Sequence, residues 1–96
     1  MVALDIKNII INYLRNYDPV YVGLFGSFAR GDWSHDSDID ILVLFKSNYS
    51  LLQLIRIENE LSDRLGRRVD LITEGSIKNN RVKQSIQNDL KIIYKA

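Results

Sequence analysis

Two short segments of this sequence combine residue types that can bind phosphate and metal. Residues 26–31 read Gly-Ser-Phe-Ala-Arg-Gly directly after an apolar run, and residues 37–43 read Ser-Asp-Ile-Asp-Ile-Leu-Val. A third acid, Asp70, lies in a later apolar segment, residues 68–72. A glycine turn that exposes backbone N–H groups to phosphate, together with three carboxylates, is the equipment for two-metal chemistry on a nucleoside triphosphate.

The three acids are expected to gather at one site. Side chains alternate along a strand, so Asp38 and Asp40 share one face, about 6.6 Å apart at ~3.3 Å per residue. Unpaired carboxylates at that spacing repel each other, and a divalent cation relieves the repulsion. Magnesium suits such ligands because it keeps positions for water and phosphate oxygens. If the strand of Asp70 pairs beside that of Asp40, Asp70 can bind a second metal or act as general base.

The glycine turn is predicted to bind the phosphates. Gly26 lets the backbone approach phosphate closely, and Ser27 adds a hydroxyl donor where a short helix begins. Arg30, one turn further on, is predicted to reach phosphate or to support Asp36. Ser37 is predicted to orient either the loop or the phosphate tail.

Hydrophobic spacing predicts the elements that position these residues. Helices are expected over residues 3–17, 27–30, 50–65 and 79–88, strands over 20–25, 38–45 and 68–73, and a short edge strand over 91–94. The strand over 38–45 is apolar almost throughout, as a central strand buried on both faces would be. The order of elements predicts an α/β (α+β) sandwich with a small mixed β-sheet flanked by helices.

The same periodicity predicts the buried helix faces. The expected inward residues are Ile6, Ile9, Ile10, Tyr13, Leu14 and Tyr17 in the first helix, Leu51, Leu54, Ile55, Leu61 and Leu65 in the long helix, and Val82, Ile86 and Leu90 near the last. Glu58 falls within the stripe of the long helix, and the pattern does not explain it.

Composition and charge exclude several kinds of site. The 96 residues predict one domain, 1–96, without an internal boundary. The chain has no cysteine and only one histidine, His35, which excludes disulfides, thiolate or multi-histidine metal sites and a catalytic thiol. A formal net charge of +1 gives no case for direct nucleic-acid or membrane binding. The N-terminus fits neither a signal peptide nor a membrane span, so a cytoplasmic location is expected.

At these motifs the sequence resembles the polymerase-β-like nucleotidyltransferase superfamily, and most closely its minimal nucleotidyltransferases (MNT). The signature of that group is Gly-Ser-x-Ala-Arg-Gly, then Ser-Asp-Ile-Asp-Leu, and later Gly-Arg-x-Val-Asp-Leu. Residues 26–31, 37–41 and 66–71 correspond to it, with Ile41 in place of the leucine, and the resemblance covers nearly the whole chain. Trp33 and His35 depart mildly from the group, which usually has smaller residues or proline in that loop.

The resemblance implies a function and a partner. It implies two magnesium ions held by Asp38, Asp40 and Asp70, triphosphate contacts from Gly26, Ser27 and Arg30, and transfer of AMP from ATP to a hydroxyl group. Proteins of this group are typically paired with a HEPN-domain protein as a toxin–antitoxin module. The MNT protein is then the antitoxin, and it adenylylates a tyrosine of a ribonuclease-like HEPN toxin. A hetero-oligomer with such a toxin is therefore expected.

Two alternatives stay open beside this protein adenylyltransferase. The first is a non-catalytic binding module that neutralises its partner by steric masking; the three acids argue against it, because clustered carboxylates are costly to retain without metal. The second transfers a nucleotide to a small molecule or an RNA 3′ end. The short chain, with no room for an acceptor-binding domain, and the absence of a basic groove weigh against it. Trp33 can stack on adenine or a partner, or anchor the loop.

Overall fold

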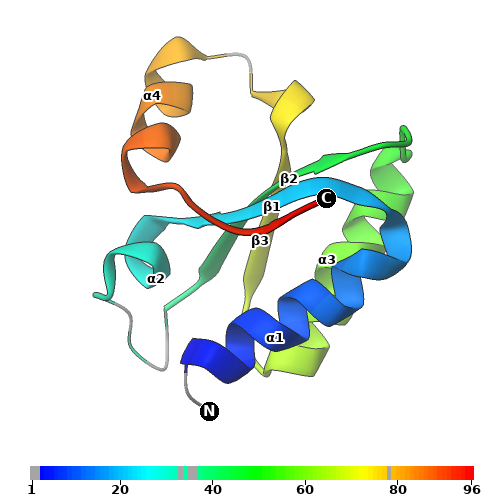
Figure 1. Ribbon diagram of the computed structural model, residues 1–96, viewed down its shortest axis with the longest axis horizontal. Helices are drawn as coiled ribbons and strands as arrows, with labels where there is room; N and C mark the ends of the chain where they lie inside the picture. The colour runs from blue at the N-terminus through cyan, green and yellow to red at the C-terminus, as the bar shows by residue number, and fades with distance from the viewer. Residues whose placement is uncertain (1–2, 33, 35–36, 78) are drawn as a thin grey trace.

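The chain folds into one mixed β-sheet covered by helices on both faces (Figure 1). The computed structural model describes residues 3–32, 34, 37–77 and 79–96. Its elements are α1 (Ala3–Leu14), the 3-10 turn η1 (Arg15–Tyr17), β1 (Pro19–Phe25), α2 (Gly26–Arg30), β2 (Ile39–Phe45), α3 (Leu51–Leu65), β3 (Val69–Thr73), the 3-10 turn η2 (Glu74–Ser76), α4 (Asn80–Asp89) and β4 (Lys91–Lys95). The predicted α/β class and small mixed sheet are confirmed.

The strand order is β3-β2-β1-β4, so β2 is central and β4 is an edge strand, as predicted. β3 runs parallel to β2, and the other neighbouring strands pair antiparallel. A parallel pair needs a long crossover connection, and α3 provides it. Figure 1 shows α1 and α3 on one face of the sheet and α4 on the other.

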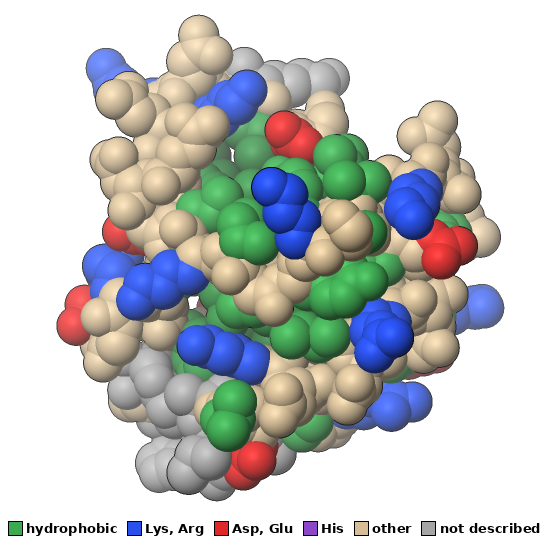
Figure 2. Space-filling view, viewed as in Figure 1, with side chains coloured by type: hydrophobic (Ala, Val, Ile, Leu, Met, Phe, Trp, Pro, Cys, Tyr) green, Lys and Arg blue, Asp and Glu red, His purple; other side chains and the backbone are tan. Residues whose placement is uncertain are grey.

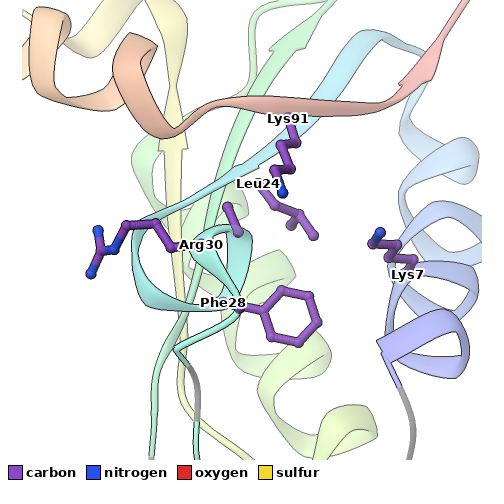
Figure 3. Close-up of a pocket in the computed structure, with 7 residues that line it drawn as sticks. Lys7, Leu24, Phe28, Arg30 and Lys91 are labelled. Atoms are coloured by element: carbon purple, nitrogen blue, oxygen red, sulfur yellow. The ribbon is translucent and has the colours of Figure 1, made fainter.

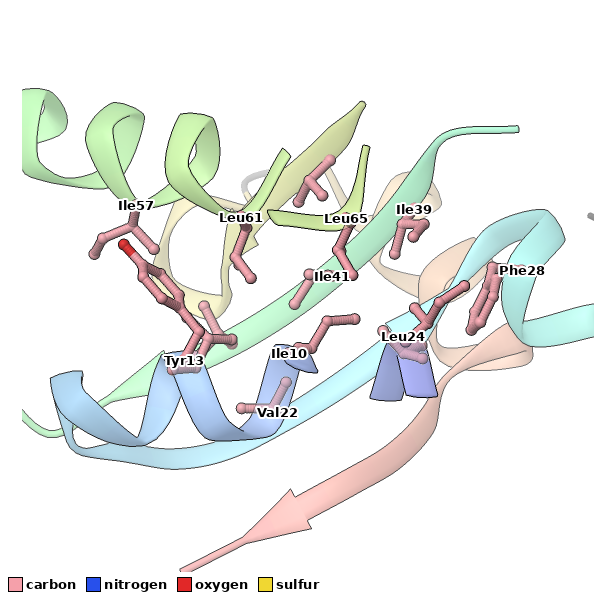
Figure 4. Close-up of a cluster of buried hydrophobic side chains, with 14 of the residues drawn as sticks. Ile10, Tyr13, Val22, Leu24, Phe28, Ile39, Ile41, Ile57, Leu61 and Leu65 are labelled. Carbon is pink, nitrogen blue, oxygen red and sulfur yellow. The ribbon is translucent and has the colours of Figure 1, made fainter. Parts of the chain in front are cut away.

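The main hydrophobic core lies between the sheet and helices α1 and α3. Figure 4 shows side chains of both helices pointing at the sheet, among them Ile10 and Leu61. Along β2, Ile39, Ile41 and Val43 are fully buried in this core. Because side chains alternate, the residues between them face α4, and they include Asp40. The core therefore holds β2 so that its acid points to the opposite layer.

Replacing a buried leucine of α3 tests this packing. Leu61 is 0% exposed, and Leu61→Ala is expected to lower the free energy of unfolding by about 2–5 kcal/mol, since it removes buried methyl groups and leaves a cavity. Leu52, on the same helix, is 80% exposed, and Leu52→Ala should change it by less than about 0.5 kcal/mol. Urea unfolding measures both; equal effects would contradict the assigned core.

The predicted boundaries are close to the observed ones. The first helix ends at Leu14 and continues as the turn η1, whereas one helix over 3–17 was expected. β2 begins at Ile39, one residue later than predicted. α3 begins after Ser50, whose hydroxyl accepts a hydrogen bond from the Gln53 N–H while the Gln53 side chain accepts one from the Ser50 N–H. This capping box fixes the start of the helix.

Two of the predicted helix faces are partly wrong. In α3, Leu51 and Ile55 are 72% and 43% exposed, whereas Ile57, which the prediction left out, is buried. Leu51 and Ile55 instead line a shallow cavity beside β3, because α3 presents a second face to the sheet edge. In α4, Ile86 is buried as predicted but Val82 is 49% exposed.

None of the helices that the structure describes is long and apolar enough to cross a membrane.

Candidate active site

The pairing of β2 with β3 brings two of the predicted acids together. Asp40 lies directly opposite Asp70 in the parallel register, and the two carboxyl groups are close enough to share a hydrogen bond. Side chains of paired residues in neighbouring strands point to the same face of the sheet. The expectation that Asp70 reaches the cluster of Asp40 is therefore confirmed.

The electrostatics of Asp40 show that acids converge here. The pKa of Asp40 is raised to about 6: burial is the largest cause, followed by the charge of Asp70, the hydrogen bond to Asp70 and the charge of Asp38. The positive charge of Arg30 acts in the opposite direction. A carboxyl group whose charged form is disfavoured by other carboxylates marks a place where a cation is favourable.

Gly26 lies against this pair for a reason that the sequence did not reveal. Its φ of +75° is the left-handed conformation that glycine adopts readily. A Cβ at this position would overlap Oδ2 of Asp40. The glycine turn therefore places the backbone at the start of α2 directly against Asp40. This contact is a second reason for a glycine here, in addition to the predicted contact with phosphate.

Arg30 has protein partners in the described structure. Its Nη1 donates to Oδ2 of Asp89 at 2.7 Å, and its Nε donates to Oδ2 of Asp32 at 3.2 Å. Asp89 is the last residue of α4, so the ion pair ties α4 to α2 across the site. The predicted contact of Arg30 with Asp36 involves a residue outside those that the structure describes. Trp33 and His35 also lie outside the described residues.

The predicted serines differ in what the structure shows of them. Ser37 orients its loop, because its hydroxyl accepts a hydrogen bond from the Ser34 N–H at 2.9 Å. Ser27 lies in the first turn of α2, beside Gly26.

Asp70 also contacts Arg68, whose Nε is 3.5 Å from Oδ1 of Asp70. Both side chains of that pair are well exposed, so the ion pair contributes little to stability.

A cavity of about 310 Å³ opens over Asp40 on the α4 side of the sheet. Its lining residues are Phe25, Gly26, Arg30, Asp40, Ile72, Val82, Ser85, Ile86 and Asp89. A second cavity, of about 190 Å³, is bounded by residues of α1, β1, α2 and β4. In Figure 3, Lys7 and Lys91 point into it, whereas the Arg30 side chain points away. No predicted acid lines this second cavity, so the first is the candidate site.

The face drawn in Figure 2 shows no concentrated basic groove, because lysine and arginine side chains are spread among polar and hydrophobic ones.

Within the described residues, no three acidic or histidine side chains already surround a common point as metal ligands do. The donor set nevertheless suits a hard divalent cation, since Asp40 and Asp70 are oxygen donors held against their mutual repulsion.

Asp89 and Glu58 were not predicted to belong to this region. An aspartate in the last turn of a helix is disfavoured by the helix dipole, which is a signal that Asp89 has some partner but does not indicate that the partner is Arg30. Glu58 was noted as a charge within an apolar stripe. Its Oε2 accepts the N–H of Leu71 at 2.8 Å, one residue after Asp70, which explains its place.

The sheet thus sets two aspartates of neighbouring strands beside a glycine turn, an arrangement that suits the nucleotidyltransferase class which the sequence resembles. Residues 8–96 match the family described as polymerase beta, nucleotidyltransferase, and the chain belongs to this family. The resemblance to the minimal nucleotidyltransferases is thereby confirmed, and the protein is an enzyme of the nucleotidyltransferase class.

Individual relatives show which nucleotidyltransferases this chain is similar to. The chain is 46% identical over 90 residues, 90% of this chain and 92% of the relative, to MJ1217 of Methanocaldococcus jannaschii, whose name assigns it provisionally to the protein adenylyltransferases. It is 47% identical over 73 residues to the protein adenylyltransferase MntA of Thermococcus cleftensis, covering 76% of this chain and 71% of that one. A crystal structure of a toxin–antitoxin with AMP-PNP superposes with a TM-score of 0.84 at 27% identity, over 94% of this chain and 73% of that chain.

Proposed function

We propose that this protein is an antitoxin that transfers AMP from ATP to a hydroxyl group, a tyrosine, of a HEPN-domain toxin in the cytoplasm. The observation that carries the proposal is the pairing of Asp40 with Asp70 beside Gly26. This arrangement of acids supports chemistry on a nucleotide phosphate, whereas steric masking alone would not need it. The relatives named protein adenylyltransferase support a protein as the acceptor.

Each residue of the site has a proposed part. Asp38, Asp40 and Asp70 would hold magnesium, which when bound supplies positive charge to the reacting phosphate. The backbone and hydroxyl at Gly26 and Ser27 bind the triphosphate. Asp70, at the sheet edge and 36% exposed, accepts the proton of the attacking hydroxyl. The cavity of about 310 Å³ between sheet and α4 admits the nucleotide.

The partner is proposed from the solved structures. One neighbour is a tri-AMPylated Shewanella oneidensis HEPN toxin in complex with an MNT antitoxin, at a TM-score of 0.81. That complex shows the fold that this chain shares, at 24% identity. For this chain we propose the same kind of partner, held in a hetero-oligomer, with the 1–96 segment as one catalytic domain.

The pair of Arg30 with Asp89 yields a testable result. If phosphate competes with Asp89 for the Arg30 guanidinium, Asp89→Asn is expected to lower the KM for ATP by about two- to fivefold, a small effect because the ion pair is exposed. Asp32→Asn removes the longer, more exposed contact of Arg30 and should have a smaller effect. Steady-state kinetics of both variants measure this. A raised KM in Asp89→Asn would mean that Asp89 holds Arg30 in its productive place.

Co-expression tests the proposed function. The chain is produced with the HEPN-domain protein proposed as its partner, and the partner is analysed by intact-mass and peptide mass spectrometry. One or more AMP units on a tyrosine, absent with the Asp38→Asn/Asp40→Asn variant, is the expected result. An unmodified partner that both forms bind and neutralise equally would establish steric masking instead.

A further inference from the structure

Strand β3, which carries Asp70, lies at the edge of the sheet, and among the strands that the structure describes it has β2 alone as a neighbour. Its backbone groups alternate between the two sides. The carbonyl of Arg68 accepts the Ile39 N–H at 2.9 Å, so residues 68 and 70 direct their backbone groups toward β2. The N–H groups of Val69 and Leu71 therefore point away from the sheet, and they flank Asp70 on both sides.

Helix α3 supplies an acceptor to each of these two N–H groups. The Leu71 N–H donates to Oε2 of Glu58 at 2.8 Å, and the Val69 N–H donates to Oγ of Ser62 at 3.1 Å. The Ser62 hydroxyl in turn donates to the carbonyl of Glu58 at 2.9 Å. An edge strand that would otherwise expose unpaired N–H groups is thus bound on both sides, by β2 and by two side chains.

The two hydrogen bonds can form together because the spacing of Glu58 and Ser62 along the helix is close to that of Leu71 and Val69 along the strand. Glu58 and Ser62 are four residues apart in a helix, which is about 6.0 Å of rise. Val69 and Leu71 are two residues apart in a strand, which is about 6.6 Å. The helix and the strand run in opposite directions, so Glu58 meets Leu71 and Ser62 meets Val69. One turn of α3 therefore fits the two residues that bracket Asp70.

We propose that Glu58 and Ser62 are positioning residues for the reaction: they fix the backbone on both sides of Asp70 and so hold its carboxylate opposite Asp40. This inference rests on the proposed function of the acids. A hydrogen bond to a carboxylate is stronger than one between neutral groups, so Glu58 contributes the larger share. The triphosphate side of the site, at Gly26 and Ser27, belongs to α2, which takes no part in the hydrogen bonds of Glu58 and Ser62 to β3.

Substitutions at Glu58 separate positioning from folding. Glu58→Gln keeps an acceptor oxygen, whereas Glu58→Leu has similar size and none. Asn59→Leu, an equally large polar-to-leucine change at the exposed neighbour, is the matched control. All are assayed well below their unfolding midpoints, with metal affinity followed by titration with Mn²⁺ in the absence of nucleotide, and exchange of the Asp70 and Leu71 amides followed by NMR.

The expected result is a kcat about 10- to 100-fold lower in Glu58→Leu, with the KM for ATP within about threefold of wild type. Mn²⁺ affinity falls about tenfold, and the Leu71 amide exchanges faster. Glu58→Gln stays within about threefold of wild type in each measurement, and Asn59→Leu is unchanged. Unaltered kcat and metal affinity in a Glu58→Leu protein that is merely less stable would overturn the inference. Absence of transfer in wild type would refute the proposed function alone, because the metal and exchange measurements still test the positioning.

Discussion

Replacing Asp40 with asparagine is expected to abolish nucleotidyl transfer and, at the same time, to stabilise the metal-free protein. Loss of a metal ligand removes several kcal/mol of charge stabilisation, and each 1.36 kcal/mol is tenfold in rate, so the rate should fall by at least about 10³-fold. Stability changes in the opposite direction, because the charged form of Asp40 is disfavoured first by burial and then by the charges of Asp70 and Asp38. An amide at position 40 can donate a hydrogen bond to the Asp70 carboxylate instead.

The pH dependence follows from the raised pKa. Asp40 has a pKa of about 6 in the folded protein and 3.8 as its ordinary value, so the folded state binds a proton more tightly. Its protonation therefore stabilises the fold fully below about pH 4, and this contribution is lost as the pH rises through 6. At pH 8, Asp40→Asn should be roughly 1–2 kcal/mol more stable than wild type, after allowance for solvent screening. The difference should vanish near pH 4.

Chemical unfolding at pH 4, 6 and 8 without divalent ions measures this difference, and magnesium should stabilise wild type but not the variant. Asp63→Asn, which changes an exposed acid of α3, is the control and should behave like wild type at every pH. An Asp40→Asn protein less stable than wild type at pH 8 would mean that burial and the neighbouring acids do not disfavour the charge of Asp40 in the folded chain.

Gly26→Ala is expected to damage the site more than any other glycine substitution in the described turns. The new Cβ would overlap Oδ2 of Asp40, so either the carboxylate or the turn must shift. The φ of +75° adds about 1–2 kcal/mol of backbone strain. A displacement of about 1 Å at a reacting centre can cost 10²-fold in rate, and we expect at least that loss.

Gly31→Ala is the matched control for this effect. Gly31 has a similar φ of +83°, but a Cβ there would meet no atom within 4 Å. It therefore reproduces the backbone strain without the overlap. Both variants should lose about 1–2 kcal/mol of stability from strain, while only Gly26→Ala loses most of its transfer activity. Equal activities in the two proteins would show that the contact of Gly26 with Asp40 does not matter for the reaction.

The fold and the acids could be predicted because their signals are local. The place of Asp40 in a strand and the turn at Gly26 follow from the geometry of a few neighbouring residues, whereas Asp38 lies just before the strand rather than in it. The central position of β2 could be predicted from its unbroken apolar run. The sequence could place Asp70 beside Asp40 only on the condition that β3 paired with β2, and the parallel register meets that condition.

What could not be predicted depends on contacts between distant residues. Leu51 and Ile55 fit the helical period as well as buried residues do, but α3 turns that face toward the edge of β3, where little covers it. Glu58 breaks the apolar pattern because it binds a backbone group 13 residues further along. Asp89 meets Arg30 across 59 residues, and neither spacing nor composition indicates that pair.

The central claim, that this protein moves the nucleotidyl part of a nucleotide onto a protein, is tested most directly by label transfer from ATP. The chain is incubated with magnesium and the proposed HEPN-domain partner, in parallel reactions with ATP labelled at the α-phosphate and ATP labelled at the γ-phosphate. We predict label on the partner from the α-position only, and none with the Asp38→Asn/Asp40→Asn variant. Label from the γ-position, or no label on protein from either position despite a stable complex, would contradict the account.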